Sequence, residues 1–277
     1  MFFMSLYHYT SVDVLASILK NNAIRFSSLS RMDDPDEVQT VDFDNIGRFL
    51  YASCWTNIKD ESIPQWSMYS NGMKGVRIEL SDERPNCIFQ VEKRRDDNGN
   101  LMEVMPLLFD SKEYTVSPPY IPQLIKMKYT DDMEKLFPKV YIRTETATGY
   151  EESIMLNDIG KYKRNAWSFQ HEVRFVFTAV PWERTKELIK LQENLLHNFS
   201  GGLNPGDAGY ESDTPINRLR LIADKSFMDV PLSDNVTFKI VAGPKCSDGQ
   251  LELLQLLKEK YSRIESVKIS KLMGHIV

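Results

Sequence analysis

Residues 6–27 read LYHYTSVDVLASILKNNAIRFS, a stretch that predicts a strand, a helix and a second strand. Leu6 to Thr10 is rich in aromatic residues and ends in polar ones, which is typical of a short strand. From Val12 to Lys20 the apolar residues recur with the spacing of a helix that has one buried face. The residues of that face are Val14, Leu15, Ile18 and Leu19.

The boundaries of this helix are marked by polar residues. Ser11 and Asp13 are both candidates for the N-cap, because their side chains can accept a bond from an early backbone N–H. Asn21 and Asn22 end the helix, because Asn tolerates the left-handed conformation of a C-cap. Residues 24–27 then alternate apolar and polar side chains as a second strand does.

Further strands and helices are predicted along the rest of the chain. The strands are expected at 49–55, 76–80, 172–180 and 236–242, with an edge strand at 266–270, and the helices at 61–69, 183–198 and 249–261. Strands and helices alternate too rarely for a parallel α/β sheet, so the fold class is α+β with a mixed or antiparallel core. We expect one domain over residues 1–277, which is within the range of a single core with insertions.

Two regions interrupt this pattern. Residues 84–165 show no clean period and are interpreted as an insertion-rich region with helical insertions. Within it, 124–129 is a candidate strand and part of 141–162 is expected to be helical. Residues 200–215 are rich in Gly and Pro and predict a flexible loop or lid.

The composition excludes several classes of protein. The chain has 277 residues, a net charge of −5 and a pI near 5.5, so it lacks the basic footprint of a duplex nucleic-acid binder. Three Cys and four His are widely spaced, which fits neither a disulfide framework nor a zinc site, and free thiols indicate a reducing compartment. No leader pattern opens the chain and no apolar run approaches about 20 residues, so we expect a cytoplasmic protein without a membrane partner.

The first candidate site lies where the first strand meets the helix. His8 and Thr10 come near backbone N–H groups at this corner, which suits a ribose or a phosphate. The alternative for His8 is a core histidine with a satisfied ring. Arg25 could bind a pyrophosphate through its planar fork and shares a strand face with Ser27, whereas the alternative is a surface arginine paired with an acid.

Two later segments add candidates. Val173 alternates inward with the next aromatic residues of its strand, so Gln170, Glu172 and Arg174 are expected on the opposite face. A carboxylate on a rigid strand is well placed for catalysis, and the alternative is an exposed Glu172–Arg174 face. Trp66 and Tyr69 share a helix face, where either could stack on a base or simply pack in the core.

A cluster of acidic residues gives a competing hypothesis. Asp33, Asp34, Asp36 and Glu37 surround a proline. Clustered acids can bind Mg²⁺ and support two-metal hydrolysis, which would make the protein a metal-dependent phosphoesterase or nuclease. The alternative is a turn, because Asp before Pro commonly initiates one.

Several of these segments together resemble a bacterial family catalogued as domain of unknown function 2971. The matching pieces are residues 7–11, 24–27, 34–37, 54–55, 66–69, 75–76, 167–174 and 241–244. They span nearly the whole chain, and the family carries little established function.

A more distant resemblance implies chemistry. Residues 6–11, with 15–19 and Ile24, are similar to the opening of ADP-ribosyltransferases and RNA 2′-phosphotransferases. By this resemblance the core is an ADP-ribosyltransferase-like split sheet, NAD is the substrate, and no metal is expected. It implies that Glu172 is catalytic and that Tyr69 or Trp66 stacks on nicotinamide. The residues expected to contact NAD are His8, Tyr9, Thr10, Arg25, Ser27, Trp66, Tyr69 and Gln170.

The leading hypothesis is therefore an NAD-dependent ADP-ribosyltransferase or NAD glycohydrolase of bacterial or phage-defence type, with an unknown macromolecular acceptor. It predicts that His8, Arg25 and Glu172 point into one pocket. The second hypothesis is a non-catalytic nucleotide-binding or partner-binding module. It is motivated by Tyr9, which stands where many ADP-ribosyltransferases have Gly and crowds the carboxamide pocket.

Overall fold

A computed structural model of the chain describes residues 5–96, 98–116, 118–146, 149–181 and 225–276. The first half contains β1 (Leu6–Thr10), α1 (Val12–Asn21), β2 (Ala23–Ser28), η1 (Leu29–Arg31), η2 (Pro35–Val38), η3 (Ile46–Phe49), β3 (Leu50–Thr56), α2 (Ile63–Tyr69), β4 (Val76–Leu80), α3 (Pro85–Ile88), β5 (Glu92–Arg95), β6 (Leu101–Val104), α4 (Pro106–Phe109) and β7 (Tyr114–Val116). The second half contains β8 (Gln123–Lys126), β9 (Lys128–Tyr129), α5 (Met133–Leu136), β10 (Tyr141–Thr146), β11 (Gly149–Ile154), η4 (Leu156–Asp158), β12 (Tyr162–Lys163), η5 (Asn165–Gln170), β13 (Glu172–Pro181), β14 (Phe227–Pro231), β15 (Phe238–Ala242), α8 (Asp248–Lys260) and β16 (Ile264–Ile269).

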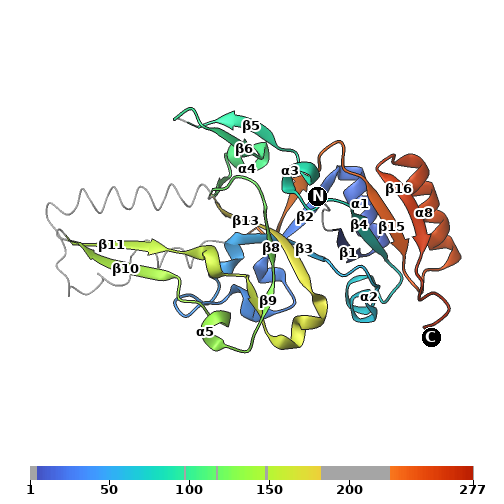
Figure 1. Cartoon of the computed structure of the whole chain (residues 1–277), viewed down its shortest axis with the longest axis horizontal. Helices are drawn as coiled ribbons and strands as arrows, with labels where there is room; N and C mark the ends of the chain where they lie inside the picture. The colour runs from blue at the N-terminus through green and yellow to red at the C-terminus, as the bar shows by residue number, and fades with distance from the viewer. Residues whose placement is uncertain (1–4, 97, 117, 147–148, 182–224, 277) are drawn as a thin grey trace.

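The main sheet branches at β3. Its principal order is β14-β2-β3-β1-β4-β15-β16, and β13 pairs with β3 while also pairing with β7 and β8 (Figure 1). All pairs in this sheet are antiparallel except β15 with β16. The predicted strands at 6–10, 24–27, 49–55, 76–80, 172–180 and 236–242 all contribute to it, and 266–270 overlaps its terminal strand. The α+β class and the mixed sheet are therefore confirmed.

The first helix has the predicted caps but a rotated buried face. Ser11 is the N-cap, since its Oγ accepts the Val14 N–H at 3.1 Å, and Asn22 ends the helix with a left-handed φ of 50°. Val14 was expected in the core but is 42% exposed, whereas Val12 is buried. Two residues are about 200° apart around a helix, so burying Val12 turns Val14 toward solvent.

Strand β13 is buried on both faces, which overturns the alternative of an exposed polar face. Val173, Phe175 and Phe177 lie in the main core as predicted. Glu172 and Arg174 point the other way and are also buried, at 5% and 0% exposure. A second hydrophobic core lies on part of this side, built from residues of η1, η2, η3 and β3 together with residues of the insertion region.

The insertion region contains strands where helix was expected. Residues 141–162 were predicted to be partly helical, but β10 and β11 form a hairpin within 141–154 (Figure 1), and the helical part is the short 3-10 helix η4. This hairpin extends away from the body of the molecule, and Tyr141 and Ile154 at its base pack against the second hydrophobic core. Residues 124–129 form β8 and β9, in agreement with the predicted strand. The predicted helix at 183–198 and the loop at 200–215 lie outside the described residues.

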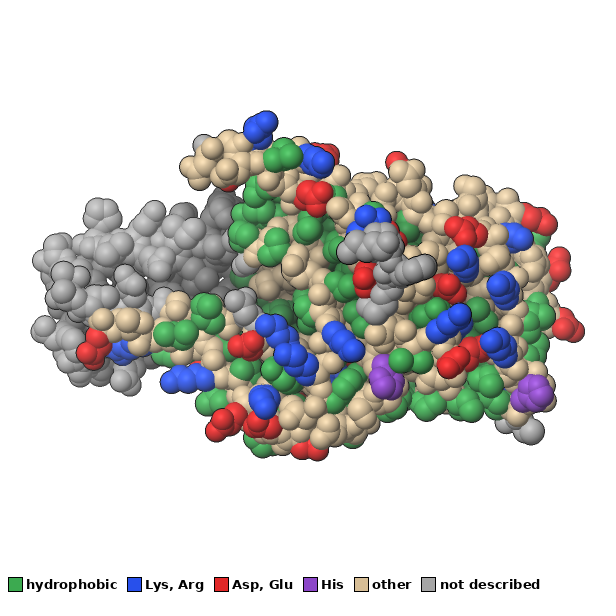
Figure 2. All heavy atoms as spheres, in the orientation of Figure 1, with side chains coloured by type: hydrophobic (Ala, Val, Ile, Leu, Met, Phe, Trp, Pro, Cys, Tyr) green, Lys and Arg blue, Asp and Glu red, His purple; other side chains and the backbone are tan. Residues whose placement is uncertain are grey.

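The surface carries both signs of charge. On the face shown in Figure 2, Lys and Arg side chains lie among Asp and Glu side chains. Within the described ranges, no helix combines the length and the apolar character that crossing a membrane requires.

Candidate functional site

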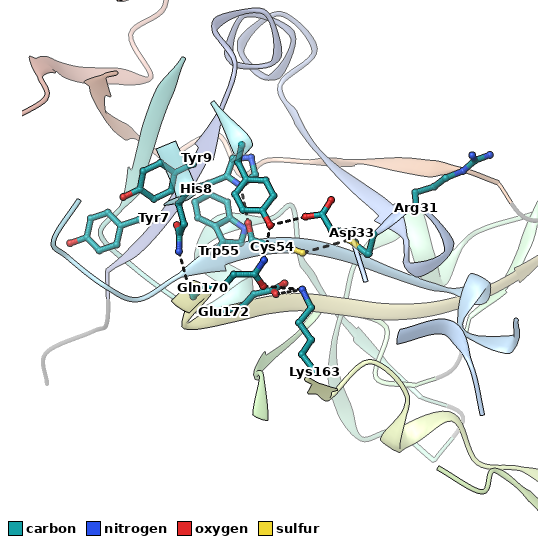
Figure 3. A pocket seen from close by; sticks show the side chains of 13 residues that line it. Tyr7, His8, Tyr9, Arg31, Asp33, Cys54, Trp55, Lys163, Gln170 and Glu172 are labelled. Atoms are coloured by element: carbon teal, nitrogen blue, oxygen red, sulfur yellow. Dashed lines mark hydrogen bonds and ion pairs between the residues drawn. The ribbon is translucent and has the colours of Figure 1, made fainter. Parts of the chain in front are cut away.

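A pocket opens beside β1, β3 and the start of β13, and helix α2 forms one of its walls (Figure 3). Its volume is about 130 Å³, which is small beside the roughly 300–1,000 Å³ of pockets that hold drug-sized ligands. The lining residues are Tyr7, His8, Tyr9, Arg31, Met32, Asp33, Cys54, Trp55, Gln65, Tyr69, Lys163, Gln170 and Glu172. Aromatic rings and charged groups therefore surround a cavity that is about the size of one small ring.

Strand β3 brings the two ends of this site together. Thr56 at the end of β3 is the register partner of Tyr7 on one side and of Glu172 on the other. The residue after Tyr7 is His8, so the histidine and the carboxylate come from strands that flank β3. Both side chains line the pocket although 164 residues separate them in sequence (172 − 8).

The imidazole of His8 is held by the backbone of β3. Its Nδ1 lies 2.8 Å from the carbonyl oxygen of Cys54, and its ring centroid lies 5.1 Å from that of Trp55. A carbonyl can only accept, so Nδ1 carries the proton and Nε2 is left as the acceptor of the neutral ring. Burial lowers the pKa of His8, and the bond to Cys54 opposes this only in part, so the neutral form is favoured.

Tyr69 and Gln170 form a directed chain of hydrogen bonds in the pocket. Gln170 Nε2 donates to the Tyr69 hydroxyl at 2.6 Å, and that hydroxyl donates to Asp33 Oδ2 at 2.7 Å. Lys163 Nζ donates to Gln170 Oε1 at 3.0 Å, which fixes the orientation of the amide. Gln65 Nε2 donates to the backbone oxygen of Gln170 at 2.8 Å and ties α2 to the turn that precedes β13.

The carboxylate of Glu172 is paired with two buried cations. Lys163 Nζ lies 2.7 Å from Glu172 Oε2, and Arg174 Nε donates to Glu172 Oε1. Burial alone would raise the pKa of Glu172, but the charges of Arg174 and Lys163 outweigh it and hold this pKa well below its usual value. Glu172 is therefore ionised throughout the neutral range.

Glu37 completes a buried cluster of two anions and two cations. Lys163 Nζ lies 3.0 Å from Glu37 Oε1, and the two form an ion pair whose angles do not meet those of a hydrogen bond. Arg174 Nη1 donates to Glu37 Oε2. Exposure of all four side chains is 6% or less. We name Glu37, Lys163, Glu172 and Arg174 the ion cluster.

The four acids of the metal hypothesis have separate partners. Asp33 accepts from Tyr69, Asp34 accepts the backbone N–H of Asp36, and Asp36 pairs with Arg164 at 2.7 Å. Glu37 belongs to the ion cluster. Within the described part of the chain, no three His, Cys, Asp or Glu side chains are grouped in a way that could hold a metal ion. For Asp34 the alternative of a turn residue is the one observed, because Asp34 caps the 3-10 helix that begins at Pro35.

Four of the eight residues predicted to contact NAD line the pocket, namely His8, Tyr9, Tyr69 and Gln170, and so does the catalytic candidate Glu172. Gln170 was expected there by strand alternation, but it ends η5 rather than lying in β13. His171 takes a left-handed φ of 42°, and this turn lets Gln170 and Glu172 reach the same pocket.

Arg25 and Ser27 do not line the pocket, contrary to the prediction. Arg25 lies on the exposed side of β2 and donates to both oxygens of Asp229 in β14, with an Nε to Oδ1 distance of 2.9 Å. Its guanidinium carbon lies 3.6 Å from the centroid of the Phe227 ring. Ser27 pairs through its backbone with Ala52 and Phe227. The alternative of a surface arginine paired with an acid is the one observed.

Thr10 and Trp66 are also outside the set of lining residues. Thr10 is buried where β1 pairs with Val76 of β4. Trp66 is fully buried, packs edge-on against Tyr9 at a centroid distance of 4.8 Å, and donates its indole N–H to Glu61 at 3.0 Å. Trp66 therefore anchors α2, and Tyr69 is the aromatic residue that this helix presents to the pocket.

Several pocket residues were not predicted from the sequence to be site residues. Lys163 lies in a stretch without a clear period, and Arg31 points away from the ion pair of Lys163 and Glu172 (Figure 3). Cys54 and Trp55 belong to a strand that was recognised, yet strand propensity assigns no role to them. Only the pairing of β3 with β1 and β13 identifies them as pocket residues.

Comparison with known proteins adds no relative: no family model matches the chain, and neither a curated protein nor a solved structure matches it. Membership of the family that the sequence resembles stays a prediction. The chemistry of the site therefore rests on its geometry.

Proposed function

We propose that this pocket binds the nicotinamide end of NAD and that the protein is an ADP-ribosyltransferase-like enzyme with Glu172 as its catalytic carboxylate. The observation that carries the proposal is that His8 and Glu172 line one pocket together with the ring of Tyr69. The resemblance of residues 6–11 to the opening of ADP-ribosyltransferases agrees with it. The branched mixed sheet supports the finer, ADP-ribosyltransferase-like description of the fold.

The proposed step breaks the glycosidic C–N bond of NAD. Nicotinamide leaves as a neutral base with the bonding electron pair, and positive charge grows on the ribose. A nucleophile on an acceptor, or water, forms the new bond to ribose C1′ and releases its proton to solvent. Transfer to water gives NAD glycohydrolysis, and transfer to a macromolecule gives ADP-ribosylation.

The charge state of the site suits this step. Glu172 is anionic, and a fixed anion in a buried site stabilises a developing cation more strongly than it would in water. Its two oxygens have about four lone-pair sites, more than its two cationic partners occupy, so the carboxylate can still accept a ribose hydroxyl. The neutral His8 ring adds no positive charge that would oppose the reaction.

The size and walls of the pocket suit one aromatic ring. About 130 Å³ accommodates a small ring, so the rest of the dinucleotide would extend past the pocket mouth. Tyr69 is only partly buried, and its raised pKa, caused by burial and by the bond to Asp33, keeps the hydroxyl protonated as a donor. An aromatic face against nicotinamide contributes stacking of about 0.5–1.5 kcal/mol.

The test is release of nicotinamide from NAD carrying label in the nicotinamide ring, measured with and without candidate protein and nucleic-acid acceptors. Glu172→Gln removes the charge at nearly constant shape and should lower kcat by roughly 10²–10³-fold. Arg25→Gln is the matched control, because Arg25 lies outside the pocket and should leave kcat unchanged. Absence of both NAD binding and turnover in the unaltered protein would defeat the proposal.

A second candidate is a nucleotide-binding module without turnover. Its support is that both Glu172 oxygens already have a cationic partner, which is how a purely structural carboxylate is held. Calorimetric titration with NAD separates the two candidates when it is combined with product analysis. Saturable binding with no nicotinamide or ADP-ribose product would favour the module.

A further inference from the structure

Lys163 connects the ion cluster to the pocket amide. Its ammonium group carries three N–H donors, and three oxygens lie within 3.0 Å of it: Glu172 Oε2, Gln170 Oε1 and Glu37 Oε1. Its side chain is 3% exposed, so water has little access to replace any of these contacts. In Figure 3 the side chain of Lys163 extends toward Glu172 and Gln170.

The direction of each hydrogen bond follows from this lysine. An ammonium can only donate, so the Gln170 atom that faces it must be the amide oxygen. The amide nitrogen must then face Tyr69 and donate to its hydroxyl, whose own proton is given to Asp33. One side chain therefore determines the orientation of Gln170 and of the Tyr69 hydroxyl.

The pair of strands that presents Lys163 also holds the backbone of Glu172. β12 has two residues and pairs in parallel with β9, where Lys163 lies in register with Tyr129. The Tyr129 hydroxyl accepts the backbone N–H of Glu172 at 2.7 Å. The β9–β12 unit thus contacts Glu172 at its backbone through Tyr129 and at its carboxylate through Lys163.

We infer that Lys163 is a positioning residue, one that keeps Glu172 ionised and sets the orientation of the Glu172 carboxylate and the Gln170 amide toward the pocket. The role in turnover rests on the proposed function, whereas the effect on Glu172 does not. The charged and titratable groups that face Glu172 are Lys163 from β12, Arg174 from β13, Glu37 from η2, Tyr129 from β9, Cys54 from β3 and Tyr69 from α2. Lys163 donates hydrogen bonds to the side chains of both Glu172 and Gln170.

The test compares variants that keep the charge of the ion cluster close to balance. Lys163→Met with Glu37→Gln removes one cation and one anion, so the remaining Arg174–Glu172 pair stays neutral overall. Glu37→Gln alone is its reference, and Lys163→Arg keeps the cation but changes the donor geometry. Folding of each variant is checked by thermal denaturation before any titration.

Two measurements are used, so that the proposed enzymatic function and the proposed effect of Lys163 on Glu172 can be tested independently. The first is the ¹³C chemical shift of Glu side-chain carboxyls against pH, with the Glu172 signal assigned by its loss in Glu172→Gln. The second is the pH dependence of kcat for nicotinamide release from NAD. The first readout needs no turnover.

We expect the Glu172 signal of the double variant to titrate at least about one pH unit above that of Glu37→Gln, because an opposite charge this close lowers a carboxyl pKa by roughly 1–3 units. The acid limb of the kcat profile should move by the same amount, with a smaller change in KM. Lys163→Arg should keep the low carboxyl pKa and lose kcat, because its fork cannot reproduce the three contacts.

An unchanged Glu172 titration in the double variant would overturn the inference. So would a kcat for Lys163→Arg equal to that of the unaltered protein. If the unaltered protein releases no nicotinamide while the carboxyl titration shifts as expected, the proposed function fails and the effect of Lys163 on Glu172 stands.

Discussion

Tyr69 donates a hydrogen bond of 2.7 Å to Asp33 and thereby joins helix α2 to the loop between η1 and η2. Both residues line the pocket, and Asp33 is exposed. The same hydroxyl accepts from the buried Gln170. This bond therefore connects an exposed carboxylate at the pocket to the interior chain that ends at Glu172.

Asp33→Ala should weaken NAD binding without unfolding the protein. Loss of one partly exposed hydrogen bond costs about 1 kcal/mol, which corresponds to a rise of roughly fivefold in KM. Asp33→Asn is the control, because its amide oxygen can still accept from Tyr69. Steady-state kinetics with NAD measure both, and an equal KM in the two variants would show that the bond has no part in binding.

The stability of the protein should fall as the pH drops below 6.5, in part because of His8. Burial lowers the pKa of His8 below the 6.5 of an unfolded histidine, so the unfolded chain binds the proton more readily. The contribution is fully present above pH 6.5 and is lost as the pH falls toward the folded pKa. His8→Gln should flatten this decline, and urea midpoints at pH 5 and 7.5 for both proteins measure it.

Arg174→Met should destabilise the protein strongly. It leaves Glu37 and Glu172 buried with one lysine between them, and removal of one partner from a buried ion pair costs about 3–5 kcal/mol. Arg25→Met is the matched control, since its pair with Asp229 is exposed and such pairs contribute about 0–1 kcal/mol. Urea denaturation of the two variants should separate them clearly, and equal midpoints would mean that the ion cluster contributes little.

Gly75→Ala should destabilise the turn that leads into β4. A Cβ at this position would lie 2.1 Å from the backbone oxygen of Thr10, so β1 and the turn would have to separate. Forcing an atom into a packed site costs about 1–3 kcal/mol. Gly249→Ala in α8 is the control, because nothing lies within 4 Å of the added atom. Thermal denaturation should show a lower Tm for the first variant only.

Local patterns predicted the parts of the fold that have local causes. The caps at Ser11 and Asn22 and the inward alternation of Val173 depend on neighbouring residues, so they could be predicted from the sequence. The partner of Arg25 could not, because Asp229 lies 204 residues away and reaches it only through the pairing of β14 with β2.

The candidate site was predictable to a similar extent. His8 and Glu172 were identified by their residue types and strand positions, and they line one pocket. Trp66 and Tyr69 share a helix face in sequence, and only the packing of Tyr9 against Trp66 decides which one reaches the pocket. Lys163 comes from a strand of two residues, which is too short to show a period.

Because the sheet branches at β3, backbone amides on the two sides of the pocket should exchange hydrogen at different rates, slowly in β3 and faster in α2. The end of β3 near Thr56 is bonded to β1 on one edge and to β13 on the other, so its amides exchange only when the sheet itself opens. Helix α2 has seven residues and is attached largely through side chains, so it can open locally. A ligand that contacts both walls would therefore slow exchange mainly in α2, and this protection would report occupancy of the pocket even in a variant that cannot turn over.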